Sequence, residues 1–211
     1  MRKLKFITGE YYHIFNRGVD KRIVFQDKKD LERFLKSMEE FNTINPIGSI
    51  YEHSRLKNKF GNLVSKKTKL VNFICYCLNP NHYHFILEQL VDGGIEKFMH
   101  RLGVGYTNYF NKRYNRSGAL FQGTFKAIHI SSNEYLLHLS AYVNLNDKVH
   151  NFGNLVSKKS SWEEYVGNKD GFCKKDIILN QFNSISEYRN FSKVSLEIIK
   201  ERKEMEKLLL E

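Results

Sequence analysis

The sequence predicts an α+β fold in which an antiparallel sheet carries helices on one face and a small helical appendage follows. Two observations lead to this prediction. Short segments with the two-residue alternation of strands are interspersed with longer segments of helical periodicity, and turn-forming residues separate them. The chain has 211 residues, of which 41% are hydrophobic and 14% aromatic, so it can bury the core of one compact domain.

The N-terminal part is expected to form a strand and then a helix. Tyr11 to Asn16 is rich in aromatic and β-branched residues, which favour strands. Leu31 to Phe41 places apolar residues at helical spacing, and Asp27 and Asp30 just before it can cap the start of a helix.

A β-hairpin is predicted next along the chain. Val71 to Leu78 and Tyr83 to Leu87 read as strands, and they flank the turn-forming triplet Asn79-Pro80-Asn81. The two strands should therefore pair antiparallel.

The remaining elements of the main domain are a helix, a strand and a third helix. Apolar residues recur at helical spacing from Ile95 to Phe110, and Phe125 to Ile130 reads as a fourth strand. Ser131 or Ser132 can then cap a helix that runs to about Asn146. The resulting order β, α, β, β, α, β, α is the ferredoxin-like order with one helix added.

One segment of eight residues occurs twice, because residues 60–67 and 152–159 are identical. Both copies fall between predicted elements, so we interpret them as loop insertions; a basic loop used twice for binding is the alternative. We expect the main domain to span residues 1–150, with an insertion at about 53–69. Residues 151–211 should hold the second insertion and the helical appendage.

The charge balance predicts a polyanionic partner. The 34 Lys and Arg residues exceed the 23 Asp and Glu residues and give a net charge of +11, which suits nucleic acid or an anionic surface. No apolar run reaches the length of a membrane span, and no signal peptide is visible, so we expect a cytoplasmic protein without a membrane partner. Cys75, Cys77 and Cys173 form no disulfide framework, as expected in a reducing compartment.

The sharpest local motif is His82-Tyr83-His84. Side chains alternate along a strand, so the two histidines should share one face while Tyr83, Phe85 and Leu87 share the other. A pair of imidazoles with added oxygen ligands can bind a divalent metal. Histidines that only form hydrogen bonds are the alternative.

Zinc is a second alternative for this hairpin, because two cysteines precede the histidines. Cys75 and Cys77 are spaced differently from the usual Cys-x2-Cys of structural zinc sites. Both thiols can equally be core residues.

The third predicted helix carries a candidate nucleophile. Tyr142 and Asn146 are four residues apart and therefore neighbours on one helical face. A tyrosine hydroxyl can attack a phosphodiester, and an amide oxygen one turn later can join a metal shell. The alternative is a stripe of core aromatic residues.

Two long segments without acidic residues favour single-stranded nucleic acid over a membrane. No Asp or Glu occurs from Lys97 to Asn133 or from His53 to Leu87, whereas both segments are rich in Lys and Arg. The first also contains Tyr106, Tyr109 and Tyr114, and aromatic rings among basic residues suit a strand whose bases stack.

In these motifs the chain resembles the REP-associated tyrosine transposases and related single-tyrosine insertion-sequence transposases. The resemblance spans about residues 10 to 192. The matching stretches are Tyr11 to Gly18, Tyr76 to Phe85, Tyr109 to Tyr114, Gly118 to Lys126, Tyr135 to Leu137 and Tyr142 to Asn146.

The resemblance implies an HUH-type catalytic domain with a ferredoxin-like fold. It implies that His82 and His84 bind Mg or Mn, that Asn146 completes the metal site, and that Tyr142 is the nucleophile. The expected reaction cleaves and rejoins single-stranded DNA at hairpin-bearing repeat ends through a 5′-phosphotyrosine intermediate. A homodimer is also implied. The residues that we expect to contact DNA are Arg17, Lys112, Arg113, Arg116, Gln122 and Lys126.

Two departures from the family pattern keep other functions open. Family members usually have Asn-Pro where this chain has Asn146-Asp147, and the insertions lengthen two connections. An inactivated or non-catalytic protein that binds hairpin nucleic acid is therefore the alternative. A domesticated protein that processes repeats by the same chemistry would have the same sequence features.

Overall fold

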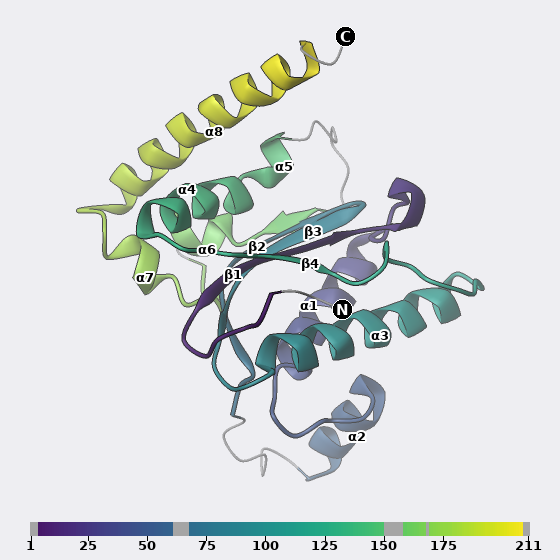
Figure 1. The fold of residues 1–211 in the computed structure, drawn as a ribbon. Coiled ribbons are helices and arrows are strands. Elements are labelled where there is room, and N and C mark those ends of the chain that lie inside the picture. Colours follow the sequence, from purple (N-terminus) through teal and green to yellow (C-terminus); the bar gives the residue numbers. More distant parts are fainter. Residues whose placement is uncertain (1–3, 61–67, 150–157, 168, 209–211) are drawn as a thin grey trace.

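The computed structural model describes residues 4–60, 68–149, 158–167 and 169–208, and Figure 1 shows their arrangement. A five-stranded antiparallel sheet has the order β4-β1-β3-β2-β5. Its strands are β1 (Tyr11–Arg17), β2 (Val71–Asn79), β3 (His82–Gln89), β4 (Lys126–His129) and β5 (Lys159–Ser160). The α+β class and all four strands that the sequence predicts are confirmed.

The helices lie on both sides of this sheet (Figure 1). They are η1 (Val19–Lys21), α1 (Lys28–Glu40), α2 (Ile50–Phe60), α3 (Gly94–Arg113), α4 (Asn133–Asn144), α5 (Asn146–Val149), α6 (Trp162–Val166), α7 (Asp176–Leu179) and α8 (Ile185–Leu208). Within the described ranges, no helix is long and apolar enough to cross a membrane.

α1 and α3 cover the first face of the sheet. Asp27 caps α1 by accepting a hydrogen bond from the Asp30 backbone amide at 3.0 Å, as the sequence predicts. Phe34 of α1 contacts Tyr106 of α3 at a ring-centroid distance of 4.8 Å, and both join a core that includes Phe85 of β3. The predicted burial of the Tyr83, Phe85 and Leu87 side against helices is confirmed.

A second helical layer covers the other face, so the prediction of helices on one face only is wrong. Cys77 and Ile86 point into a second core with Val143 of α4, Ile178 of α7 and Tyr188 of α8. β2 is consequently buried on both sides along almost its whole length. A continuous apolar run such as Val71–Leu78 is typical of a strand buried on both faces.

The two predicted insertions lie only partly within the described residues. Residues 50–60 form α2, so the first part of the segment expected as a loop at about 53–69 is helical. Residues 61–67 and 152–157 of the repeated octapeptides lie outside the described ranges. The last residue of the second copy, Lys159, begins β5 and pairs with Leu78 of β2.

The third predicted helix ends earlier than expected. Ser132 caps α4 by accepting from the Tyr135 amide, but the helix stops at Asn144. Leu145 leaves the helical conformation with φ −109° and ψ 13°, and Asn146 then begins α5. Asn146 is therefore one short turn beyond the helix that carries Tyr142.

Candidate active site

The β2–β3 hairpin presents both histidines toward the second helical layer. His84 lies opposite Cys77 on β2 and opposite Phe15 on β1, whereas His82 lies opposite Asn79 at the turn. The two imidazole centroids are 5.2 Å apart. The strand alternation predicted for this motif thus places the pair on one face, away from the core of Tyr83 and Phe85.

The hydrogen bonds of His82 determine which ring nitrogen carries the proton. Its Nδ1 atom lies 2.6 Å from Oδ1 of Asn81, which can only accept, so Nδ1 donates. Nε2 then carries a lone pair and accepts from Nδ2 of Asn79 at 3.0 Å. In the neutral ring, a proton on Nδ1 leaves Nε2 with a lone pair that can bind a metal.

Asn146 completes a cluster of donor atoms at this nitrogen. Its Oδ1 atom lies 3.1 Å from His82 Nε2 and accepts from Asn79 Nδ2 at 2.7 Å. Asn146 Oδ1 and Asn79 Nδ2 thus both lie within hydrogen-bond distance of His82 Nε2. The side chain is fully buried, and its Nδ2 atom makes no protein hydrogen bond of normal geometry among the described residues.

This donor set fits a divalent cation. Two imidazoles and an amide oxygen are ligand types that first-row divalent metals accept. Among the described residues, this site included, no group of three or more His, Cys, Asp or Glu side chains is arranged to hold a metal. The amide oxygen of Asn146, 3.1 Å from His82 Nε2, is the candidate for a third protein ligand at this site.

Tyr142 lies over the histidines. Its ring meets that of His84 edge-on, with centroids 5.6 Å apart and an interplanar angle of 81°. Burial raises the pKa of the Tyr142 phenol above its usual value, and the nearby Asn146 side chain partly offsets this effect. Tyr142 and Asn146 are thus neighbours, as the sequence predicts, although a helix end separates them.

His13 is a site residue that the sequence analysis did not single out. It lies on β1, is 6% exposed, and its Nε2 atom is 2.9 Å from Nδ1 of His84. Burial lowers the pKa of His13 to about 4, so the ring is neutral at physiological pH. If His84 binds a metal, it does so through Nε2, because its Nδ1 atom contacts His13.

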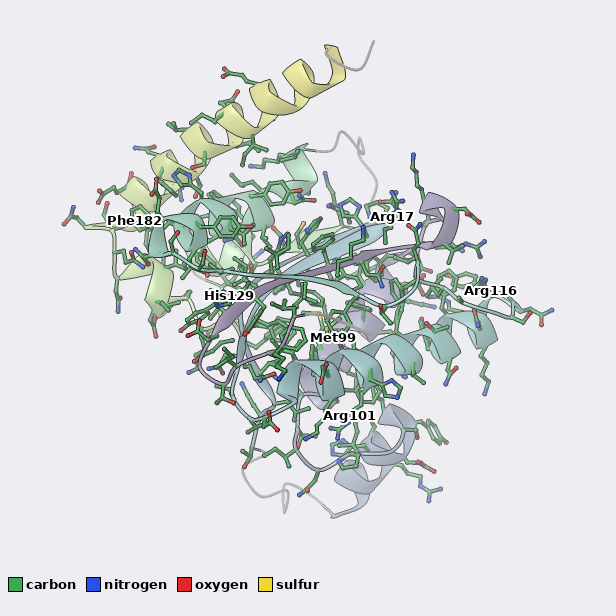
Figure 2. The ribbon with its side chains drawn as sticks, viewed as in Figure 1. Arg17, Met99, Arg101, Arg116, His129 and Phe182 are labelled. Carbon is green, nitrogen blue, oxygen red and sulfur yellow. The ribbon has the colours of Figure 1, made fainter. Side chains whose placement is uncertain are left out.

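A pocket of about 650 Å³ opens beside the histidines. Three of the residues expected to contact DNA line it: Arg17, Gln122 and Lys126. Arg17 Nε donates to the side-chain oxygen of Gln122, which joins the end of β1 to the loop before β4. Figure 2 labels Arg17 at this end of the sheet.

Four further residues of this pocket, Phe15, Asn16, Lys21 and Asn81, were not predicted as site residues. Lys21 and the aromatic ring of Phe15 line it together with the histidines. Asp20 and Lys21 have φ values of 53° and 59°, a left-handed backbone that is uncommon outside glycine and clusters at functional sites. The Phe15 ring stacks on His84 with centroids 5.6 Å apart.

The structure does not bring the other three expected DNA contacts to this pocket. Arg113 forms ion pairs with Asp27 and with the buried Asp30, and these link α3 to α1. Lys112 and Arg113 line a different pocket of about 720 Å³. Arg116 lies beyond the end of α3 and donates to the carbonyl of Ala119 (Figure 2).

Comparison with known proteins identifies a family. The family described as "Transposase IS200 like" matches residues 7–146. No curated protein matches. Six chains of solved structures match, among them one described as a REP-associated tyrosine transposase bound to a REP hairpin. That chain is 14% identical, with a TM-score of 0.49 over 80% of this chain and 86% of that chain, which is too distant to assign residue roles.

Proposed function

The chain belongs to the IS200-like transposase family, and we propose that it cleaves and rejoins single-stranded DNA with Tyr142 as the nucleophile. One observation carries this proposal. Tyr142 lies against His84, and Asn146 contacts His82 at 3.1 Å, so nucleophile and metal-ligand candidates share one site. The family match confirms the resemblance to transposases that the sequence motifs indicate.

In this proposal His82, His84 and Asn146 hold a Mg or Mn ion. When bound, the ion supplies positive charge that stabilises the charged phosphate during attack. The lone pair on His82 Nε2 and the contact of His84 Nδ1 with His13 support ligation through both Nε2 atoms. Asn79 orients the third ligand by donating to Asn146 Oδ1 at 2.7 Å.

The chemistry assigned to Tyr142 exchanges one phosphodiester for another. Its phenol oxygen attacks phosphorus, the bond from phosphorus to the 3′-oxygen breaks, and a 5′-phosphotyrosine link forms. The phenol loses a proton and the departing 3′-oxygen gains one. Attack by a 3′-hydroxyl on the phosphotyrosine reverses these changes and rejoins the strand, so neither water nor a nucleotide is consumed.

We propose that the pocket beside the histidines receives the DNA strand. Arg17, Lys21 and Lys126 supply positive charge for phosphates, Gln122 orients Arg17, and Phe15 offers a ring for base stacking. The resemblance stated above adds hairpins as the preferred form of the DNA and a homodimer as the assembly. It also keeps Lys112, Arg113 and Arg116 as predicted contacts for a hairpin outside the pocket.

A covalent protein–DNA adduct tests the proposal. Purified protein is incubated with labelled single-stranded hairpin DNA and Mn or Mg, and adducts are resolved on a denaturing gel. The wild type should form an adduct, whereas Tyr142→Phe should fold, bind DNA with unchanged affinity and form none. Tyr135→Phe is the matched control, because it removes a hydroxyl from the same helix at a side chain that is 36% exposed.

Two results would contradict this function. An adduct that persists in Tyr142→Phe moves the nucleophile to another residue. A wild type that binds the hairpin but forms no adduct with either metal is a non-catalytic binding protein.

A further inference from the structure

A chain of buried hydrogen bonds joins α8 to β2 through the last residue of α4. The Tyr76 amide of β2 donates to Ser161 Oγ at 2.9 Å, and Ser161 Oγ donates to Asn144 Oδ1 at 2.6 Å. Asn144 Nδ2 then donates to the Tyr188 hydroxyl at 3.0 Å, and this hydroxyl contacts Ser140 Oγ at 3.2 Å. All four of these polar side chains have 0% exposure.

The hydroxyl groups of this chain have further buried partners, since Ser161 Oγ also lies 3.3 Å from the Tyr76 carbonyl. Ser140 donates its only hydroxyl proton to the carbonyl of Leu137 at 2.7 Å, so Tyr188 is the donor in the contact between the two hydroxyls. Tyr188 therefore accepts from Asn144 and donates to Ser140. Both polar atoms of the Asn144 side chain thus have a buried partner, Ser161 on one side and Tyr188 on the other.

Asn144 lies between the two proposed site residues in the sequence, at the last position of α4. Tyr142 precedes it on α4, and Asn146 begins α5 after the helix end at Leu145. A helix end leaves backbone groups without intrahelical partners and frays readily. The buried chain of hydrogen bonds instead fixes this helix end against β2, the strand that leads into the hairpin carrying His82.

The partners of Asn144 come from beyond the family match. That match ends at residue 146, whereas Ser161 precedes α6 and Tyr188 lies on α8. α8 runs along the side of α4 that faces away from the sheet (Figure 1). The ring of Tyr188 is also held by Tyr165 and Phe182, with centroids 5.3 and 5.2 Å away.

We propose that Tyr188 is a positioning residue, which acts through Asn144 to hold Tyr142 and Asn146 over the histidines. The C-terminal segment is then part of the catalytic apparatus. This inference rests on the proposed function, because it assigns a role toward Tyr142 and Asn146.

The test compares two substitutions that remove one buried hydroxyl each. Tyr188→Phe keeps the ring packing but leaves Asn144 Nδ2 without its acceptor. Tyr165→Phe is the matched control, because Tyr165 donates to the Ile74 carbonyl at 2.7 Å in the same core and makes no bond to Asn144. Both variants should fold, with melting temperatures a few degrees below that of the wild type.

Two measurements are made on both variants. Hydrogen exchange of the peptide covering residues 141–149, without metal or DNA, should be faster in Tyr188→Phe and unchanged in Tyr165→Phe. The rate of adduct formation at saturating hairpin DNA should fall about ten-fold or more in Tyr188→Phe alone, since misplacing reacting groups by 1 Å can cost about 100-fold. DNA affinity should stay unchanged in both.

The proposal is overturned if the two variants are equally slow in adduct formation, because Tyr188 then serves stability only. An unchanged adduct rate in Tyr188→Phe overturns it as well. If the wild type forms no adduct, the proposed function fails, and hydrogen exchange decides the positioning claim. Equal exchange in the two variants then refutes it.

Discussion

At the scale of single residues, neighbouring side chains determine what each histidine of the site can do. Asn81 fixes the proton of His82 on Nδ1, and the partner of His84 Nδ1 is His13. A ligand whose second nitrogen is held in this way keeps its tautomer and its ring orientation. His13 therefore belongs to the site although it need not touch a metal.

Replacing His13 with leucine should weaken metal binding. The change removes the contact at His84 Nδ1, and loss of such an outer partner typically lowers metal affinity about 10–100-fold. The affinity for Mn is measured by electron paramagnetic resonance on protein without DNA. His129→Leu is the control, because His129 lies on β4 and pairs with Glu10 instead. Equal Mn affinity in His13→Leu and the control would exclude this role.

The cap of α1 predicts a pH dependence of stability. Arg113 lowers the pKa of Asp27 below its usual value of 3.8. Because the folded-state pKa is depressed, this stabilisation is present above pH 3.8 and is lost as the pH falls through the folded pKa. Asp27→Asn keeps the capping oxygen but removes the charge.

Thermal unfolding of the wild type and of Asp27→Asn is measured from pH 6 down to about pH 2, a range chosen to cover a depressed carboxyl pKa. The melting temperature should fall more steeply in the wild type at the acidic end. Parallel curves for the two proteins would mean that the ion pair adds no stability.

At the scale of elements, α1 and α3 are joined by a polar cluster centred on Arg113. Its guanidinium bonds Asp27 at the start of α1 and, at 2.6 Å, the fully buried Asp30. Tyr109 and Tyr114 also donate to Asp30, at 3.1 and 2.8 Å. A buried carboxylate destabilises the fold unless hydrogen bonds and an opposite charge compensate for its lost hydration.

Arg113→Ala should therefore destabilise the fold strongly. Removing one partner of a buried ion pair costs about 3–5 kcal/mol, because the other charge stays buried. Lys112→Ala, on the neighbouring residue of α3, should change the free energy of unfolding by no more than about 0.5 kcal/mol. Urea unfolding of both variants measures this difference. A loss below about 1 kcal/mol in Arg113→Ala would show that the ion pairs of Arg113 add little to the stability of the fold.

At the scale of the whole molecule, the net charge of +11 is combined with a basic pocket at the site. Three cations line this pocket: Arg17, Lys21 and Lys126. Two segments of the sequence contain no acidic residue and are rich in Lys and Arg. In the proposed function, this charge attracts a nucleic acid over the surface, and the pocket binds phosphates beside the histidines.

DNA affinity should consequently fall steeply with salt. Each phosphate contact with single-stranded DNA contributes about −0.7 to the slope of log affinity against log salt concentration, so three contacts predict a slope of about −2 or steeper. Lys21→Ala should reduce the slope by about 0.7. Fluorescence anisotropy with a labelled strand measures both slopes. An affinity that does not depend on salt would contradict the nucleic-acid partner.

The sequence by itself determined the features that depend on neighbours along the chain. Alternation with a period of two placed His82 and His84 on one face and Tyr83, Phe85 and Leu87 on the other. Helical spacing and capping residues located α1, α3 and the start of α4, and short motifs indicated the family. These features are local, because strand and helix geometry fix side-chain directions from residue to residue.

Only the tertiary structure decided the features that join distant segments. The contact of His13 with His84 spans 71 residues and depends on the register of β1 against β3. The second helical layer, the pairing of Arg113 with α1 and the early end of α4 likewise depend on which elements pack together. Strand register and packing are set by the burial of whole faces, and no local periodicity encodes which distant segment covers a face.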